Sequence, residues 1–409
     1  MGRVLSRLPS SDSPRGRRRV LLLNHFAVPL HAPGGTRHAE LVSHLANWEG
    51  TIVAGNRNLL TRARTDFDRA FRAVWVSPYS DNGPARVLNW LSFVVTSLVA
   101  GVRLPRPDVV YASSPHLFAG VSGWLLARIR RSAFVLEVRD LWPDVLVDMG
   151  TLRGDSIVLR VLRSLESFLY RRAERIVVLT PGVGTRLAER GIWPAKIVVI
   201  PNGADPADFA SPAPRSDVRA RFGFDGFTVL YAGAHGPANA LDLVLDAAAK
   251  VATVRSDVRF VLVGDGVQKP ALVARASREG IDNVRFLEPV AKNDMPALLH
   301  AADVGLHVLA DVPLFHFGVS PNKLYDYLAA GLPVVTNTPG EVAAIVRDAD
   351  AGVAVAPTAI DEGVLCIVGA SDERRRAWSE HGRAWMAANR SRRALAAKLE
   401  TMLDELVGG

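Results

Sequence analysis

Short runs of apolar residues recur along the chain and alternate with longer stretches that have a helical period. The first run, at 20–23, ends in a loop with two glycines, and a helical period follows at 37–45. Strand, glycine loop and helix in this order are typical of the first unit of a doubly wound α/β sheet. Because the runs are almost wholly apolar, they predict parallel strands covered on both faces.

These runs predict two series of strands, separated by a stretch at 204–222 that has no clear periodicity. The first series is 20–23, 51–54, 108–111, 133–137 and 175–179, and the second is 228–231, 259–263, 283–286, 304–307 and 333–335. The predicted fold class is therefore α/β with two Rossmann-like domains that face an interlobe cleft. The expected divisions are a flexible basic tail at 1–19, an N-terminal lobe at 20–203, a linker at 204–222, a C-terminal lobe at 223–375 and terminal helices at 376–409 that pack back on the N-terminal lobe.

Composition fits a folded protein, since 49% of the 409 residues are hydrophobic and 22% are charged. The single cysteine, Cys366, excludes a disulfide scaffold and a cysteine-based metal site. The net charge is +8, and the first nineteen residues hold six arginines against Asp12. No apolar segment in this tail resembles a signal peptide, so we expect a cytoplasmic protein. A basic surplus suits nucleotides, phospholipid head groups or nucleic acid, and composition does not choose among them.

The segment 87–102 has no charged residue and lies between Arg86 and Arg103. It is shorter than the roughly twenty residues that a membrane-spanning helix needs. Two interpretations stay open. One is a buried helix of the N-terminal lobe. The other is an interfacial helix with Trp90 and Phe93 at head-group depth and an arginine at each end, which predicts peripheral contact with an anionic membrane surface.

Glycines follow several of the predicted strands. Gly34 and Gly35 come between the first strand and its helix, where glycine lets backbone N–H groups approach a phosphate at the helix N-terminus. The alternative is an ordinary tight turn. Gly233 and the stretch 264–266 (Gly-Asp-Gly) close two strands of the second series at what should be one sheet edge, where ligands of open α/β sheets bind. The pattern is not G-x-G-x-x-G, which argues against a nicotinamide dehydrogenase.

The stretch 317–335 is the most informative. Ser320 followed by Pro321 predicts a helix start with serine as the N-cap. Lys323 then lies in the first turn, where a pyrophosphate would meet backbone donors and a cation. Asp326 follows on the same face, where its carboxylate could accept from two ribose hydroxyls. The alternative is a capped surface helix with a solvated lysine and aspartate.

The sequence Ser-Pro-Asn-Lys-Leu-Tyr-Asp-Tyr-Leu-Ala-Ala-Gly-x-Pro-Val-Val at 320–335 resembles the nucleotide-binding helix of the family 4 retaining glycosyltransferases. Four further stretches are similar to that family's motifs in the expected order: 135–144, 199–205, 260–266, and 283–289 with 295–303. The stretch 135–144, with Glu-Val-Arg-Asp-Leu-Trp-Pro, resembles the branch that acts on lipid-linked saccharides, such as N-acetyl-fucosamine transferases of surface polysaccharide pathways.

The resemblance implies a GT-B fold and a nucleoside diphosphate sugar, expected to be UDP-linked, held by the C-terminal lobe. It also implies retention at the anomeric carbon, no metal or other cofactor, and a saccharide or polyprenyl-linked acceptor, so that the enzyme is a hexosyltransferase or N-acetylhexosaminyltransferase. On this basis the candidate catalytic residues are His116, Asp140 and Lys323. The candidate nucleotide-sugar-binding residues are Gly34, Gly35, Gly233, Gly264, Asp265, Gly266, Pro289, Phe317, Gly318, Val319, Ser320, Asn322 and Asp326.

Several of these roles carry an alternative or a departure from the family pattern. Asp140 is a candidate acceptor contact or base, or else an N-cap paired with Arg139. His116 falls where the family often has a histidine near the donor sugar. Gly318 occupies the place of the first acid of the family's Glu-x7-Glu motif, so sugar contacts are expected from backbone at 317–319 or from Asp311. The family's diphosphate-clamping Arg and Lys are replaced by His235 and Asn239, so that Lys323 is the clearest cation.

Three other functions compete with a glycosyltransferase. A sugar-nucleotide epimerase of the same fold would turn over the donor without an acceptor. A nucleic-acid-binding protein would use the +8 charge, but the sequence has no recognisable binding module, so no nucleic-acid partner is expected. A membrane-surface protein without catalysis would leave the pattern at 320–326 unexplained.

Overall fold

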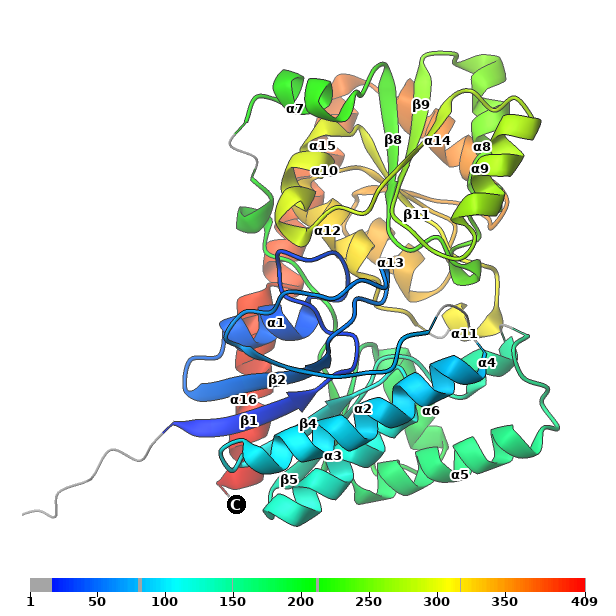
Figure 1. Ribbon diagram of the computed structural model, residues 1–409. Helices are drawn as coiled ribbons and strands as arrows, with labels where there is room; N and C mark the ends of the chain where they lie inside the picture. The colour runs from blue at the N-terminus through cyan, green and yellow to red at the C-terminus, as the bar shows by residue number, and fades with distance from the viewer. Residues whose placement is uncertain (1–16, 80–82, 149, 211–212, 317, 409) are drawn as a thin grey trace, which may run out of the picture.

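The computed structural model describes residues 17–79, 83–148, 150–210, 213–316 and 318–408. Two α/β lobes lie one above the other, each built on a parallel sheet with helices on both faces (Figure 1). The N-terminal sheet has seven strands in the order β3-β2-β1-β4-β5-β6-β7, and the C-terminal sheet has six in the order β10-β9-β8-β11-β12-β13. The predicted pair of Rossmann-like domains is confirmed.

The strands of the two sheets are β1 (Arg18–Leu23), β2 (Trp48–Gly55), β3 (Phe71–Val74), β4 (Val109–Ser113), β5 (Ala133–Val138), β6 (Arg175–Val178) and β7 (Ile197–Val199), then β8 (Phe227–Ala232), β9 (Val258–Val263), β10 (Val284–Leu287), β11 (Val304–His307), β12 (Val334–Thr336) and β13 (Gly352–Ala354).

The helices of the N-terminal lobe are α1 (Arg37–Ser43), α2 (Pro84–Arg103), α3 (Leu117–Arg130), α4 (Asp144–Asp148), α5 (Ile157–Arg172) and α6 (Pro181–Glu189). Those of the C-terminal half are α7 (Arg215–Phe222), α8 (Leu241–Val254), α9 (Lys269–Arg278), α10 (Met295–Ala301), α11 (Pro313–His316), α12 (Asn322–Ala330), α13 (Glu341–Asp348), α14 (Ile360–Gly369), α15 (Asp372–Asn389) and α16 (Arg392–Val407). Short 3₁₀ turns are η1 (Pro194–Lys196), η2 (Pro206–Phe209), η3 (Pro237–Asn239) and η4 (Lys292–Asp294).

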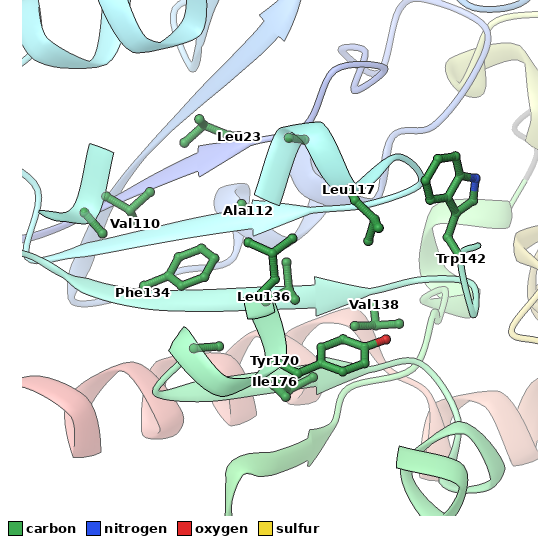
Figure 2. Close-up of a cluster of buried hydrophobic side chains, with 14 of the residues drawn as sticks. Leu23, Val110, Ala112, Leu117, Phe134, Leu136, Val138, Trp142, Tyr170 and Ile176 are labelled. Carbon is green, nitrogen blue, oxygen red and sulfur yellow. The ribbon is translucent and has the colours of Figure 1, made fainter. Parts of the chain in front are cut away.

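The N-terminal sheet buries both faces. Leu21 and Leu23 of β1 point into one apolar cluster, while Val20 and Leu22 point into another, as the two-residue period of a strand requires. The first cluster lies between the sheet and α2, α3 and α5, and Figure 2 shows part of it around Phe134. The second lies between the sheet and α1 with α16. Burial on both faces explains why the central strands are almost wholly apolar.

The terminal helices divide between the lobes. The helical pattern near the C-terminus is interrupted at Arg390 and Ser391, which separate α15 from α16. Helix α15 packs against α12 of the C-terminal lobe, whereas α16 runs down behind the N-terminal sheet (Figure 1) and buries Leu399 and Leu403 there. The expectation that the terminal helices pack back on the N-terminal lobe therefore holds for α16 and is wrong for α15.

Two predicted boundaries were wrong. The stretch 204–222 is not a plain linker, because it contains η2 and α7. Val218 of α7 is buried in the C-terminal core, and Arg215 donates to Asp303 at 2.6 Å. One buried apolar residue in an eight-residue helix leaves no detectable period. The predicted tail at 1–19 runs too far, since Arg18 and Arg19 belong to β1; residues 1–16 lie outside the described residues.

Helix α2 contains the uncharged segment 87–102. Phe93 is fully buried, and the ring of Trp90 stacks on that of His116 at 5.3 Å. The expectation that these two aromatic side chains lie at head-group depth is therefore wrong, because they face the lobe. The opposite face of α2 carries exposed apolar side chains, as described below.

Candidate active site

A cavity of about 450 Å³ lies between the lobes. Loops after the carboxyl ends of strands in both sheets line it, which is where open α/β sheets bind ligands. The N-terminal lobe contributes Gly34, Gly35, Thr36, Asn58, Arg139 and Asp140 among others, and the C-terminal lobe contributes Gly233, Gly264, Pro289, Lys292, Asn322, Lys323 and Asp326.

The glycine loop after β1 exposes backbone to this cavity. Gly34 has φ +135, a conformation that side-chain-bearing residues rarely adopt. Asn58 holds the loop by donating from Nδ2 to the Pro33 carbonyl at 2.7 Å. Helix α1 begins directly after Thr36. The Thr36 side chain does not accept a hydrogen bond from the first N–H groups of α1, so these donors lack a side-chain cap. The loop and helix start are thus built to accept an anion.

Lys323 is the central cation on the C-terminal side. Its Nζ donates to the Tyr231 hydroxyl at 2.8 Å and to Asn239 Oδ1 at 2.7 Å. Both partners are neutral, and the ion pairs among the described residues include none to Lys323. Burial lowers the pKa of Lys323 to about 7. The alternative of a solvated surface lysine is wrong, and an anion in the cavity would stabilise the charged form.

Asp326 lies beside Lys323 in the cavity and is buried. Its Oδ1 pairs with Lys292 Nζ, a residue of η4 that the sequence analysis missed. Burial raises the pKa of Asp326, and the ion pair with Lys292 only partly opposes this. The hydrogen bonds of the described residues leave Oδ2 free to accept from a ligand. Asp326 can therefore still take the predicted ribose role, and Lys292 is a second cation of the cavity next to it.

The predicted N-cap role of Ser320 was wrong. Helix α12 begins at Asn322, and Pro321 precedes it with no side-chain cap. Ser320 Oγ instead accepts from the backbone N–H of Asn202 at 2.9 Å, and the Asn202 amide donates to the Ser320 carbonyl. The serine therefore ties residues 200–202, which lead from the N-terminal to the C-terminal lobe and are called the interlobe strap below, to the start of α12. This leaves the first N–H groups of α12 uncapped beside the cavity.

An acid in place of Gly318 would be strained in this backbone. Its φ is +132, and a Cβ there would lie 2.7 Å from Thr180 Oγ1 and 2.8 Å from Glu341 Oε2. Gly318, Val319 and Ser320 do not line the cavity. Asp311 pairs with His316 at 2.7 Å on the surface and does not line the cavity either. Phe317 lies outside the described residues.

The Gly-Asp-Gly turn after β9 reaches the cavity only through Gly264. A Cβ on Gly264 would lie 1.8 Å from the Gly233 carbonyl oxygen, so only glycine allows the two strand ends to approach. Asp265 accepts from the Gly266 N–H at 2.8 Å, and neither residue lines the cavity. Both residues shape the turn that follows β9. His235 is buried beneath this turn, and burial lowers its pKa to about 4.

His116 lies in the N-terminal core and does not line the interlobe cavity. Its Nδ1 accepts from the Ala119 N–H at 3.3 Å, which caps α3, and its Nε2 lies 2.9 Å from His25 Nδ1. Burial, with Arg86 nearby, lowers the pKa of His116 to about 3. Both nitrogens are engaged and the ring stays neutral, so the predicted role near the sugar or the proton is not supported by this geometry.

Asp140 and Arg139 lie at the N-terminal wall of the cavity. Asp140 does not cap α4, which begins at Asp144, so the N-cap alternative was wrong. The Asp140 carboxylate is water-accessible but enclosed by cleft walls, which raise its pKa although Arg139 opposes the shift. Arg139 NH1 comes within 3.9 Å of where a side chain on Gly35 would begin, so its guanidinium lies beside the glycine loop. Arg139 is a phosphate-binding candidate that was missed.

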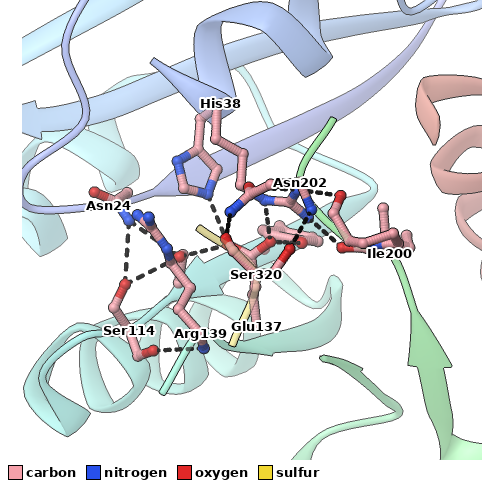
Figure 3. Close-up of polar contacts among 12 residues, drawn as sticks. Asn24, His38, Ser114, Glu137, Arg139, Ile200, Asn202 and Ser320 are labelled. Carbon is pink, nitrogen blue, oxygen red and sulfur yellow. Dashed lines mark hydrogen bonds and ion pairs between the residues drawn. The ribbon is translucent and has the colours of Figure 1, made fainter. Parts of the chain in front are cut away.

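A buried network fixes α1 to the interlobe strap (Figure 3). Glu137 accepts from Arg37 Nε at 2.8 Å and from His38 Nε2 at 2.8 Å. Burial alone would raise the pKa of Glu137, but Arg37 and His38 hold it well below its usual value. Arg37 also donates to the carbonyls of Ile200 and Pro201 at 2.8 and 2.7 Å. The glycine loop and α12 are therefore held in register through one strap.

Among the described residues, no group of three or more His, Cys, Asp or Glu side chains could hold a metal ion.

Comparison with known proteins identifies the two lobes. Residues 34–203 match the model described as "Glycosyl transferase 4-like domain", and residues 226–372 match "Glycosyl transferases group 1". The chain belongs to the family 4-like glycosyltransferases. The probable glycosyltransferase WbjE of Pseudomonas aeruginosa is 28% identical over 57% of this chain. That match spans 58% of WbjE, so the chain covers little more than half of that relative's length.

Solved structures show that this chain has the GT-B fold. Sucrose-phosphate synthase from Thermosynechococcus elongatus superposes with a TM-score of 0.74 at 16% identity, over 96% of this chain and all of that one. Anabaena Alr3699/HepE in complex with UDP and glucose superposes with a TM-score of 0.70 at 20% identity, over 95% of this chain and 99% of that one. At these identities the likeness establishes the fold alone.

Proposed function

We propose that this family member transfers a sugar, with retention, from a UDP-linked donor to a saccharide or lipid-linked saccharide acceptor. The observation that carries the proposal is the arrangement of Lys323, Lys292 and Arg139 around one cavity that also exposes the starts of α1 and α12. A diphosphate is the group that uses both the cations and the helix starts. The UDP and glucose bound by HepE support a uridine donor for this chain.

Binding would place the diphosphate between the glycine loop and α12, and the ribose at Asp326. Lys323 would gain a counter-charge that its neutral partners, Tyr231 and Asn239, do not supply. The bond between the anomeric carbon and the phosphate oxygen then breaks, and negative charge accumulates on the leaving diphosphate. Lys323, Arg139 and the Gly34–Gly35 amides stabilise that charge in a cleft that excludes water. We propose that the step needs no resident metal, as the family resemblance implies.

The acceptor hydroxyl attacks the anomeric carbon from the face that the leaving group occupies. Its oxygen forms the new bond, and its proton passes to a phosphate oxygen of the leaving group or to Asp140. The raised pKa of Asp140 brings this carboxylate closer to the range that suits a proton acceptor at neutral pH. We also propose a cytoplasmic location, where nucleotide sugars are available.

A donor assay tests this proposal. The full chain is incubated with UDP-sugars, with and without a panel of saccharide acceptors, and released UDP is measured. We expect release to depend on the acceptor, and the product to keep the anomeric configuration of the donor. Conversion of the donor to an epimer without acceptor would refute transfer and support an epimerase. Asp140→Asn should lower kcat more than it raises KM if Asp140 takes the proton.

A further inference from the structure

Helix α2 presents its apolar side chains to solvent. The buried residues of α2 are Asn89, Phe93, Ser97, Ala100 and Gly101. Phe93 is the one large apolar side chain among them, and the others are small or polar. Its exposed large side chains are Val87, Leu88, Leu91, Val95, Val99 and Val102, which are between 42% and 61% exposed. A helix on a water-soluble lobe has the opposite arrangement. The outer face of α2 therefore fits a non-aqueous partner.

The exposed residues form one continuous stripe. Leu88, Leu91, Val95, Val99 and Val102 are spaced by three or four residues, so they lie on a single face. From Leu88 to Val102 the stripe runs for about 21 Å along the helix. Trp75, which is 55% exposed, lies alongside, because Thr96 Oγ1 donates to its carbonyl at 2.9 Å. Apolar residues scattered singly over a surface are ordinary, whereas a continuous exposed apolar patch marks an interaction site.

The neighbouring helices continue the same outer surface. Helix α3 packs against both α2 and α5, and the three form one layer over the sheet (Figure 1). Outward apolar residues in this layer include Ile129 of α3 and Ile157, Val158 and Val161 of α5. The three helices carry eight arginines (two on α2, two on α3 and four on α5) and one acidic residue, Glu166, which is buried. Apolar side chains among arginines complement an anionic lipid surface.

Helix α2 fits a position along the surface of a bilayer better than one across it. Among the helices of the described residues, α2 alone is long and apolar enough to cross a membrane, with a mean hydropathy of 1.5. However, Ser97 Oγ lies 2.6 Å from Ser122 Oγ, and the Asn89 amide donates to the Ser77 carbonyl. Removing α2 from the lobe would break these bonds and expose Phe93. An interfacial helix keeps them and buries the stripe alone.

We propose that the outer face of α2, α3 and α5 docks this glycosyltransferase on an anionic lipid bilayer, with α2 lying in the membrane interface. The N-terminal end of α2 is near the active site, since Trp90 contacts Trp142 at 5.9 Å and Trp142 follows Asp140 by two residues. The docking surface does not depend on the proposed function. If that function holds, docking brings Asp140 close to an acceptor anchored in the bilayer.

Vesicle co-sedimentation of the full chain tests the proposal. The change is Val95→Asp with Val99→Asp, at positions 61% and 45% exposed. The matched control is Val254→Asp with Val273→Asp on α8 and α9 of the C-terminal lobe, at 66% and 42% exposed. Both variants keep the basic residues at 1–16. We expect the wild type and the control to pellet equally with vesicles containing phosphatidylglycerol, and the α2 variant to bind at least tenfold more weakly.

Charge and oligomeric state complete the test. We expect little pelleting with phosphatidylcholine vesicles, and less with anionic vesicles as salt is raised. Equal pelleting of the α2 variant and the wild type overturns the proposal. So does a dimer in light scattering that the α2 variant converts to a monomer, because the stripe would then meet a second copy of the chain. Thermal shift with UDP on all three proteins reports nucleotide binding separately, so failure of the proposed function is distinguished from failure of docking.

Discussion

Nucleoside diphosphate binding is expected to be coupled to proton uptake by Lys323. Burial lowers the pKa of Lys323 to about 7, and the hydrogen-bond partners of its Nζ are neutral. A diphosphate beside Nζ favours the charged form and raises that pKa toward the ordinary value of about 10.4. At pH 8 a group with a pKa of 7 is about 0.9 deprotonated, so binding should take up about 0.9 proton per site.

The sign of the pH dependence follows from the same shift. Below pH 7 the lysine is already charged, and the affinity for the diphosphate is at its highest. Above pH 7 binding must first charge the lysine, so the affinity falls by up to about tenfold per pH unit until the pKa of the complex is reached. A lysine exposed to solvent would give no such dependence in this range.

Isothermal titration calorimetry with UDP at pH 8, in buffers of different ionisation enthalpy, measures the proton count. The phosphate of UDP is almost fully ionised at that pH, so it contributes little to the number of protons taken up on binding. Lys323→Met should bind more weakly and take up no proton, whereas Lys323→Arg should keep the charge and bind with an affinity independent of pH. An uptake by the wild type equal to that of Lys323→Met would refute the reasoning.

Three other changes have defined outcomes. Asp326→Asn should weaken UDP binding by about 10- to 100-fold, because a carboxylate acceptor is lost. It should also abolish any preference for UDP over 2′-deoxy-UDP. An unchanged preference in competition binding would contradict a ribose role for Asp326. Glu137→Gln should cost about 3 kcal/mol of unfolding free energy in urea, because Arg37 stays buried without its counter-charge; a loss below about 1 kcal/mol would contradict it. Gly318→Ala should cost about 1–3 kcal/mol through its positive φ and its neighbours, while Gly369→Ala, with open space around it, should cost little.

The strands that the sequence failed to predict are all at sheet edges. Both edges of the N-terminal sheet, β3 and β7, and the edge strand β13 have only three or four residues. Edge strands are packed on fewer sides, so they need no long apolar run and leave a weak pattern. The central strands were predictable because burial on both faces demands apolar residues at every position.

The residues of the site were predictable where a local pattern carries the chemistry. Lys323 and Asp326 follow from a helix start with a cation and an acid on one face. Lys292 and Arg139 were missed because their approach to the cavity depends on distant segments of the chain. His116 is the opposite case. Its loop motif could be recognised in the sequence, but its contacts with His25 and Ala119 are set only by folding.

The central claim is that the interlobe cavity holds a nucleoside diphosphate, and a thermal-shift titration tests it most directly. The full chain and Lys323→Met are titrated with UDP, GDP, ADP and uridine. We predict that one diphosphate raises the Tm of the wild type with the logarithm of its concentration, as mass action requires, that uridine has a much smaller effect, and that Lys323→Met loses most of the shift. The absence of a shift with every nucleoside diphosphate, in a protein that melts cooperatively, would contradict the account.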